Sequence, residues 1–159
     1  MMEVCRAKVA KSLPSGATPP ATVVADAAKT PFRDESFDTV VDTFGLCSFE
    51  DPVAALREMG RVCRRRSPSR RSVGGGGGDA RGGEGDGGRI FLLEHGRSQT
   101  HGWLSNILDH FATPHAERWG CYWNRDIVGA VREAGLEIQE CRTFHLGTTY
   151  YIVATPPPR

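Results

Sequence analysis

The chain has 159 residues, with 20 Lys or Arg against 19 Asp or Glu and a formal net charge of +1. This length suits one domain, and the balanced charge argues against a general nucleic-acid binder, so we expect no nucleic-acid partner. No apolar run reaches the roughly 18 residues of a membrane-spanning helix, and no secretory signal opens the chain. The five cysteines include no Cys-x-x-Cys pair, which indicates reduced thiols in an intracellular protein.

The first part of the chain predicts a helix, a loop and two strands. Residues 2–13 carry apolar side chains at helical spacing, and a loop with several prolines follows. The β-branched run 21–25 predicts a buried strand that ends at Asp26. A turn around residues 31–35 then leads to a second predicted strand over residues 37–44.

The middle of the chain combines a clearly signalled helix with a low-complexity segment. Asp51 as the cap and Pro52 as the first helical residue predict a helix that runs to about residue 65. Residues 66–88 are rich in Arg, Ser and Gly, with too few apolar side chains to order themselves. We therefore expect a disordered insertion there that is dispensable for the fold. The apolar run 89–94 predicts a strand covered on both faces.

The last part of the chain predicts two helices and a hairpin. Residues 102–111 form an amphipathic helix, an irregular aromatic segment follows, and Asp126 caps a short helix that Gly135 ends. Residues 136–144 and 149–154 predict strands joined by a link too short for a parallel crossover, so they pair as an antiparallel hairpin. The alternation of strands and helices indicates an α/β fold with a mainly parallel sheet.

Four segments carry motifs that occur together in one known family. They are Asp26-Ala-Ala-Lys-Thr-Pro-Phe32 with Asp34–Val41, the helix Asp51–Val62, Gly87–Gly96 with its Glu-His ending, and Trp119–Asp126. The set resembles the type-11 methyltransferase domain of class I S-adenosylmethionine-dependent methyltransferases. The last two segments are similar to a subgroup of mitochondrial membrane-anchored and alkyl-thiol methyltransferases. The resemblance implies one partial Rossmann-like domain over residues 1–159, with a terminal antiparallel hairpin and a mitochondrial location.

The resemblance also implies a cofactor site, at the carboxyl ends of the strands where open α/β sheets bind ligands. The cofactor of the family is S-adenosylmethionine. Asp26 would accept a hydrogen bond from the adenine amino group, and the backbone N–H of Ala27 would meet a ring nitrogen. Phe44, Gly45 and Leu46 would line the methionine and sulfonium end. The plain alternatives are that Asp26 caps a turn and that Gly45 serves only a glycine turn.

Glu94 and His95 are the candidate catalytic residues. An acceptor thiol, hydroxyl or carbon has to lose a proton, and a histidine suits that step near neutral pH. The alternative is that His95, which follows a buried strand, has only a structural role and makes hydrogen bonds that stabilise the fold. No metal site is predicted, because His110 and His115 have the wrong spacing for one helix face and no cysteine pair supports them.

One part of the family pattern is missing from the sequence. No predicted strand is followed by a Gly-x-Gly-x-Gly loop, and no second strand ends in an acidic ribose ligand. We expect either a fragment or truncated product of an enzyme that methylates a small, apolar acceptor, or a chain whose missing part a partner supplies. We also expect weak S-adenosylmethionine binding by this chain. The alternatives are a non-catalytic binding or scaffold module, or an RNA-associated protein acting through its Arg/Gly insertion. Three interpretations stay open for four aromatic residues: they wall an acceptor pocket, they face a membrane surface, or they pack in the core. These residues are Trp103, Trp119, Tyr122 and Trp123.

Overall fold

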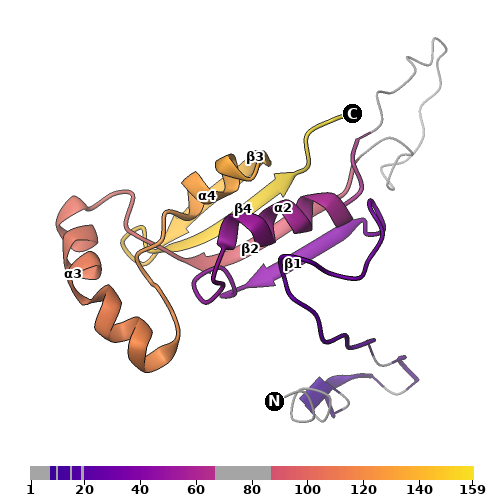
Figure 1. Cartoon of the computed structure of the whole chain (residues 1–159), viewed down its shortest axis with the longest axis horizontal. Coiled ribbons are helices and arrows are strands. Elements are labelled where there is room, and N and C mark those ends of the chain that lie inside the picture. The colour runs from indigo at the N-terminus through magenta and orange to yellow at the C-terminus, as the bar shows by residue number, and fades with distance from the viewer. Residues whose placement is uncertain (1–7, 10, 15, 19, 67–86) are drawn as a thin grey trace.

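The computed structural model describes residues 8, 9, 11–14, 16–18, 20–66 and 87–159. A four-stranded sheet has the order β1-β2-β4-β3. Its strands are β1 (Thr39–Thr43), β2 (Arg89–His95), β3 (Glu137–Phe144) and β4 (Thr149–Thr155). Helices α2 (Pro52–Val62) and α4 (Ile127–Glu133) lie over one face of the sheet, and α3 (Gly102–Trp119) lies beyond the end at which β1 and β2 terminate (Figure 1).

The pairing of the strands confirms the α/β fold and the terminal hairpin. β1 and β2 are parallel, with Val40 opposite Ile90, and β3 and β4 form the expected antiparallel pair. β4 also pairs with β2, again antiparallel. The described sheet is therefore mixed, with one parallel pair, because the first predicted strand does not join it. The predicted insertion lies outside the described residues, except for Arg66, Gly87 and Gly88.

The prediction of a buried strand over residues 21–25 is wrong. This segment is extended but pairs with no strand in the described part of the chain, and the side chain of Val24 is 85% exposed. It runs apart from the sheet (Figure 1). A β-branched run becomes a strand only when a neighbour satisfies its backbone groups and covers its side chains. The run ends, as expected, at Asp26, which forms an isolated bridge with Lys29.

The helix boundaries follow the capping signals, with one exception. The side chain of Asp51 accepts from the N–H of Ala54 (2.9 Å), and that of Asp126 accepts from the N–H of Gly129 (3.0 Å). Helix α3 is longer than predicted, since it continues through Pro114 to end at Trp119. Proline removes one backbone hydrogen bond from a helix, and the carbonyl it releases can bind water where that helix is exposed.

The core lies between the sheet and the two helices that cover it. Tyr150 and Glu94 are among the largest fully buried side chains. The apolar cluster combines residues from β2, β4, α2 and α4 with Leu46: Leu56, Ile90, Leu92, Ile127, Val131, Tyr150 and Ile152. The face of β2 that enters this core also carries Glu94, so a carboxyl group is buried at its carboxyl end.

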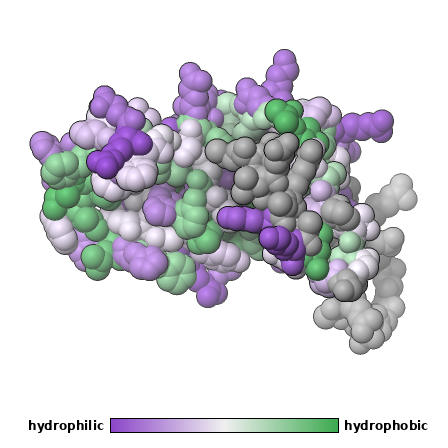
Figure 2. All heavy atoms as spheres, turned by 90° about the horizontal axis from the view of Figure 1, so that it is seen from below, coloured by the Kyte–Doolittle hydropathy of each residue, from purple (hydrophilic) through white to green (hydrophobic). Residues whose placement is uncertain are grey.

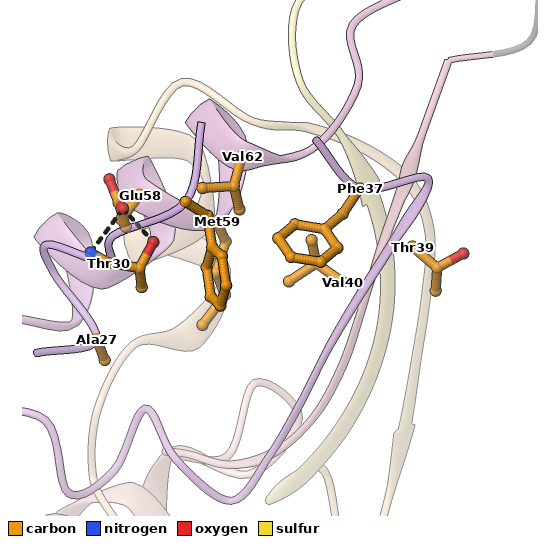
Figure 3. Close-up of a pocket in the computed structure, with 9 residues that line it drawn as sticks. Ala27, Thr30, Phe37, Thr39, Val40, Glu58, Met59 and Val62 are labelled. Atoms are coloured by element: carbon orange, nitrogen blue, oxygen red, sulfur yellow. Dashed lines mark hydrogen bonds between the residues drawn. The ribbon is translucent and has the colours of Figure 1, made fainter. Parts of the chain in front are cut away.

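Glu58 of α2 holds the turn that precedes β1. Its Oε1 accepts from the backbone N–H of Thr30 (2.8 Å) and from the Thr30 hydroxyl (2.6 Å) (Figure 3). Arg61 binds the same carboxylate at 2.6 Å and donates to the carbonyl of Phe32 at 2.8 Å. These contacts lower the pKa of Glu58 to about 2, chiefly through Arg61. Next to them lies an apolar cavity of about 260 Å³, lined partly by Phe37 and Met59 (Figure 3).

We expect Glu58→Ala to lower the free energy of unfolding by about 1–3 kcal/mol at pH 7, because the N–H of Thr30 loses its buried acceptor. The pKa of Glu58 is lowered on folding, so its contribution is present above about pH 4.5 and is lost as the pH falls toward 2. Urea denaturation at pH 7 and pH 3 measures both effects. Asp34→Ala is the control, since Asp34 binds the same Arg61 with a side chain that is 76% exposed. Equal losses in the two variants would contradict this role.

Candidate functional site

The loop after β1 and the end of β2 meet at one edge of the sheet. The N–H of Phe44 donates to the carbonyl of Leu93 (2.8 Å), which continues the parallel pairing past the end of β1. Phe44 itself has a left-handed backbone with φ of 54°, which is rare for an aromatic residue. The predicted site residues of the loop, Phe44 to Leu46, therefore lie beside the predicted pair Glu94 and His95. A constrained backbone at this edge is typical of functional loops.

Glu94 lies beneath this loop and is fully buried. Its two carboxyl oxygens accept from the backbone N–H groups of Gly45 (3.3 Å) and Leu46 (3.2 Å). Leu46 is itself a core residue, so its backbone, and not its side chain, faces Glu94. Glu94 therefore holds the loop from inside and has no surface with which to contact an acceptor.

Asp42 is a site residue that sequence reasoning missed. It lies on β1 beside Glu94, and the two carboxyl groups interact. Burial, followed by the charge of Asp42, raises the pKa of Glu94 to about 8. Burial also raises the pKa of Asp42. The pair therefore holds about one proton at neutral pH. The sequence signal for Asp42 was an acidic residue inside a predicted strand, two positions before Phe44.

His95 is the exposed member of the predicted catalytic pair. Its ring meets the ring of Phe44 edge to face, with centroids 4.4 Å apart. Burial, and then the nearby His145, lower the pKa of His95. The imidazole is therefore neutral at pH 7 and able to accept a proton. Its partner His145 contacts the Thr149 hydroxyl at 3.0 Å on the adjoining hairpin.

Asp26 and Ala27 line a separate cavity of about 410 Å³, which residues 49–51 close from the other side. Oδ1 of Asp26 accepts from the N–H of Ala28 (2.8 Å), so Asp26 does cap a turn. Its Oδ2 makes no hydrogen bond within the described residues and is free for a ligand. Alanines and Phe49 supply apolar lining, and Glu50 and Asp51 lie beside them. This donor and acceptor set fits a purine with an exocyclic amino group, so the residues present match the adenine end of S-adenosylmethionine.

The aromatic segment after α3 packs against the loop from outside. The N–H of Tyr122 donates to the carbonyl of Cys47 (2.8 Å), and the Arg125 guanidinium donates to the carbonyl of Phe49 (2.6 Å). Trp123 stacks on His115 with centroids 3.8 Å apart. The motif near residue 120 is therefore brought to the same edge as Phe44 and His95.

The outer face of α3 is apolar and exposed. Trp103, Ile107 and Phe111 follow one another at four-residue spacing, with 58%, 47% and 53% of their surfaces exposed. Figure 2 shows apolar side chains gathered at this end of the molecule. The sequence left open whether four aromatic residues lie in the core or at a surface. Of these, Trp103, Trp119 and Tyr122 are exposed, which favours a surface role. Within the part of the chain that the structure describes, no helix has the length and apolarity to cross a membrane.

Sequence comparison identifies relatives for most of the chain. Residues 1–67 match a family model described as a methyltransferase domain. Over 118 residues the chain is 40% identical to "Methyltransferase OMS1, mitochondrial" of Saccharomyces cerevisiae, covering 74% of this chain and 20% of that protein. Over 42 residues it is 55% identical to a demethylmenaquinone methyltransferase of Mycobacterium sp., covering 26% of this chain and 18% of that protein. The chain thus spans about a fifth of the length of these relatives.

Solved structures show the same fold at low sequence identity. A SAM-dependent methyltransferase from Methanosarcina mazei superposes with a TM-score of 0.61 at 18% identity, covering 96% of this chain and 76% of that one. One from Aquifex aeolicus gives a TM-score of 0.56 at 14% identity, covering 95% and 61%. The [4+2]-cyclase SpnF gives 0.57 at 15% identity, covering 86% and 56%. The fold is that of class I methyltransferases.

Proposed function

We propose, from the premise that this chain belongs to the class I methyltransferases, that it takes part in S-adenosylmethionine-dependent methyl transfer to a small, apolar acceptor. The observation that carries the proposal is the meeting of Phe44 with His95 at the carboxyl edge of the sheet, next to Gly45, whose N–H binds Glu94. The cavity at Asp26 adds a place for the adenine base. The name of the yeast relative supports a mitochondrial location.

The residues have distinct roles in this reaction. S-adenosylmethionine, when bound, supplies a methyl group already activated by its sulfonium. Gly45 has no side chain, so the backbone of the loop can approach the sulfonium end. Asp26 orients the adenine through its free Oδ2. The neutral His95 accepts the proton that the acceptor loses, and Phe44 holds the imidazole in place.

Glu94 acts as a positioning residue in this scheme. It binds the N–H groups of Gly45 and Leu46 from the core, and its burial keeps it from the acceptor. Its shared proton with Asp42 limits the negative charge under the loop to about one unit. One remaining negative charge there favours a sulfonium above it.

The exposed stripe on α3 supports the apolar class of acceptor and contact with a membrane surface that contains it. Helices with an apolar, Trp-containing face lie in the membrane interface. We expect the combined change of Trp103→Ala, Ile107→Ser and Phe111→Ser to lower co-sedimentation with phosphatidylcholine vesicles at least about tenfold, since three apolar side chains no longer insert. Asn106→Ala, an exposed change on the same helix, should leave it unchanged. Equal co-sedimentation of both variants would exclude this surface.

Cofactor contact is the direct test of the proposed function. The sequence carries no strand followed by a Gly-x-Gly-x-Gly loop, so we expect weak binding by this chain, and saturation-transfer NMR detects such binding. Saturation should reach the adenine protons of S-adenosylmethionine, and Asp26→Ala should weaken the contact about tenfold or more, because one charge-assisted hydrogen bond is lost. Asp126→Ala, which removes a similar turn cap elsewhere, is the control. Absence of transfer, or equal transfer to all three proteins, would contradict the proposal.

The alternative is a binding module of the same fold without methyl transfer. Two observations support this alternative. The solved structure of SpnF, which has the same fold, is named for a cyclase reaction, and no predicted strand of this sequence is followed by a Gly-x-Gly-x-Gly loop. Transfer of a labelled methyl group from S-adenosylmethionine to a quinone or alkyl thiol separates the two functions. A chain that contacts the cofactor but transfers no label, even at high concentration, would support the module.

A further inference from the structure

Two cysteines that lie far apart in the sequence meet beside the Phe44 loop. The thiol of Cys47 is one of the groups that raise the pKa of the Cys121 thiol, so the two side chains are neighbours. The adjoining backbone holds them together, because the N–H of Tyr122 donates to the carbonyl of Cys47 at 2.8 Å. Cys47 is buried and Cys121 half-buried, so a small reagent from solvent reaches Cys121 first. Cys63, after α2, and Cys141, on β3, belong to other parts of the described fold.

We infer that Cys47 and Cys121 form a dithiol site that a hydroperoxide converts into a disulfide. In the first step the sulfur of Cys121 attacks one oxygen of the peroxide, and an S–O bond forms as the O–O bond breaks. The departing oxygen takes the thiol proton and leaves as water from hydrogen peroxide, or as an alcohol from an organic hydroperoxide. The sulfur is oxidised to a sulfenic acid and the peroxide is reduced. In the second step the sulfur of Cys47 attacks the sulfenic sulfur, an S–S bond forms as the S–O bond breaks, and the departing hydroxide takes the thiol proton and leaves as water.

The disulfide would join two segments that border the candidate site. One is the loop of Phe44 to Cys47, and the other is the segment in which Tyr122 and Arg125 already contact residues 47–49. Oxidation therefore ties the loop to the end of α3. The inference does not depend on the proposed function, because it concerns only these two thiols.

Burial sets the conditions under which the site reacts. It is the main cause that raises the pKa of Cys121 to about 12, and the thiol of Cys47 contributes further. Thiolate is therefore scarce at neutral pH, and the rate of oxidation should rise about tenfold for each pH unit until that pKa is approached. Arg125 opposes the shift, so replacing it with Ala should slow the reaction at a given pH.

The sequence allows a direct experiment, because each of the five cysteines falls on a different tryptic peptide. The folded chain is treated with hydrogen peroxide at pH 6.5 and 8.5, blocked with iodoacetamide, digested without reduction and analysed by mass spectrometry. We expect residues 34–57 linked to residues 119–125, faster at pH 8.5. Free thiols should fall from five per chain to three, and dithiothreitol should restore them.

The variants separate this pair from general oxidation. Cys121→Ser should abolish the linked peptide, while the matched control Cys141→Ser should keep it. Because Cys121 is half-buried, its serine variant is better tolerated than a change at Cys47. The disulfide map of the unchanged chain tests the inference even if a variant does not fold. A disulfide between either cysteine and another residue would overturn the inference. So would sulfinic or sulfonic acid at Cys121 without the linked peptide, or five thiols still free.

Discussion

Gly45→Ala should lower the free energy of unfolding by about 1–3 kcal/mol and displace the Phe44 loop, because the position has no room for a side chain. A Cβ there would lie 2.3 Å from Oδ1 of Asp42 and 2.8 Å from its Oδ2. The carboxylate is not free to turn away, since it lies against the buried carboxyl group of Glu94. Urea denaturation measures the loss, and the amide NMR signals of Phe44 and Leu46 report the displacement.

Two further variants isolate the cause of this effect. Gly102→Ala adds a methyl group in the first turn of α3, where nothing lies within 4 Å, and should leave stability unchanged or slightly higher. Gly45→Ala combined with Asp42→Ala removes the obstructing carboxylate, so the amide signals should return toward those of Asp42→Ala alone. If Gly45→Ala behaved like Gly102→Ala, the close approach would have no energetic consequence.

Glu94→Gln should remove a pH dependence from the stability of the chain. The pKa of Glu94 is raised from 4.5 to about 8 on folding. Between these values the unfolded chain has released the proton that the folded chain still holds, so unfolding becomes easier as the pH rises from about 4.5 to about 8. We expect the stability of the variant relative to the unchanged chain to rise by about 1.4 kcal/mol or more across this window, which is a factor of ten or more in the folding constant.

The measurement is a series of urea titrations from pH 5 to pH 8.5 on both proteins. At pH 5 the variant should be the less stable one, since the amide of Gln turns a donor toward one of the two N–H groups that Glu94 binds. Asp42→Asn is the control: it removes the neighbouring negative charge, so the loss of stability should shift to lower pH. Parallel curves for the unchanged chain and Glu94→Gln would show that the carboxyl group titrates alike in both states.

Much of the fold follows from local signals in the sequence. Asp51 with Pro52, and Asp126 with Gly135, mark helix ends because a capping side chain or a left-handed glycine acts on residues within one turn. The link between residues 144 and 149 determines an antiparallel hairpin because so short a chain cannot cross the sheet. The rule for the carboxyl ends of parallel strands placed the candidate site at the edge where Phe44 and His95 do meet.

The same kind of reasoning failed where the outcome depends on a neighbour. Residues 21–25 have the composition of a strand but lack a pairing partner among the described residues, and strand formation is a property of the pair. The sequence predicted an apolar stripe on helix α3 but left its contacts open, and the structure shows that Trp103, Ile107 and Phe111 face outward. Periodicity shows that a helix has an apolar face, but not what that face contacts.

The sequence by itself predicted the resemblance to class I methyltransferases, the order of the elements from residue 37 onward and a set of candidate site residues. Only the tertiary structure decided their chemical states. Asp42 faces Glu94 because two parallel strands are adjacent, and Cys121 reaches Cys47 because the segment after α3 folds back onto the loop. Burial and the charge of a neighbour set each pKa, and both come from residues distant in the chain. No local pattern contains that information, because it arises only when the chain is packed.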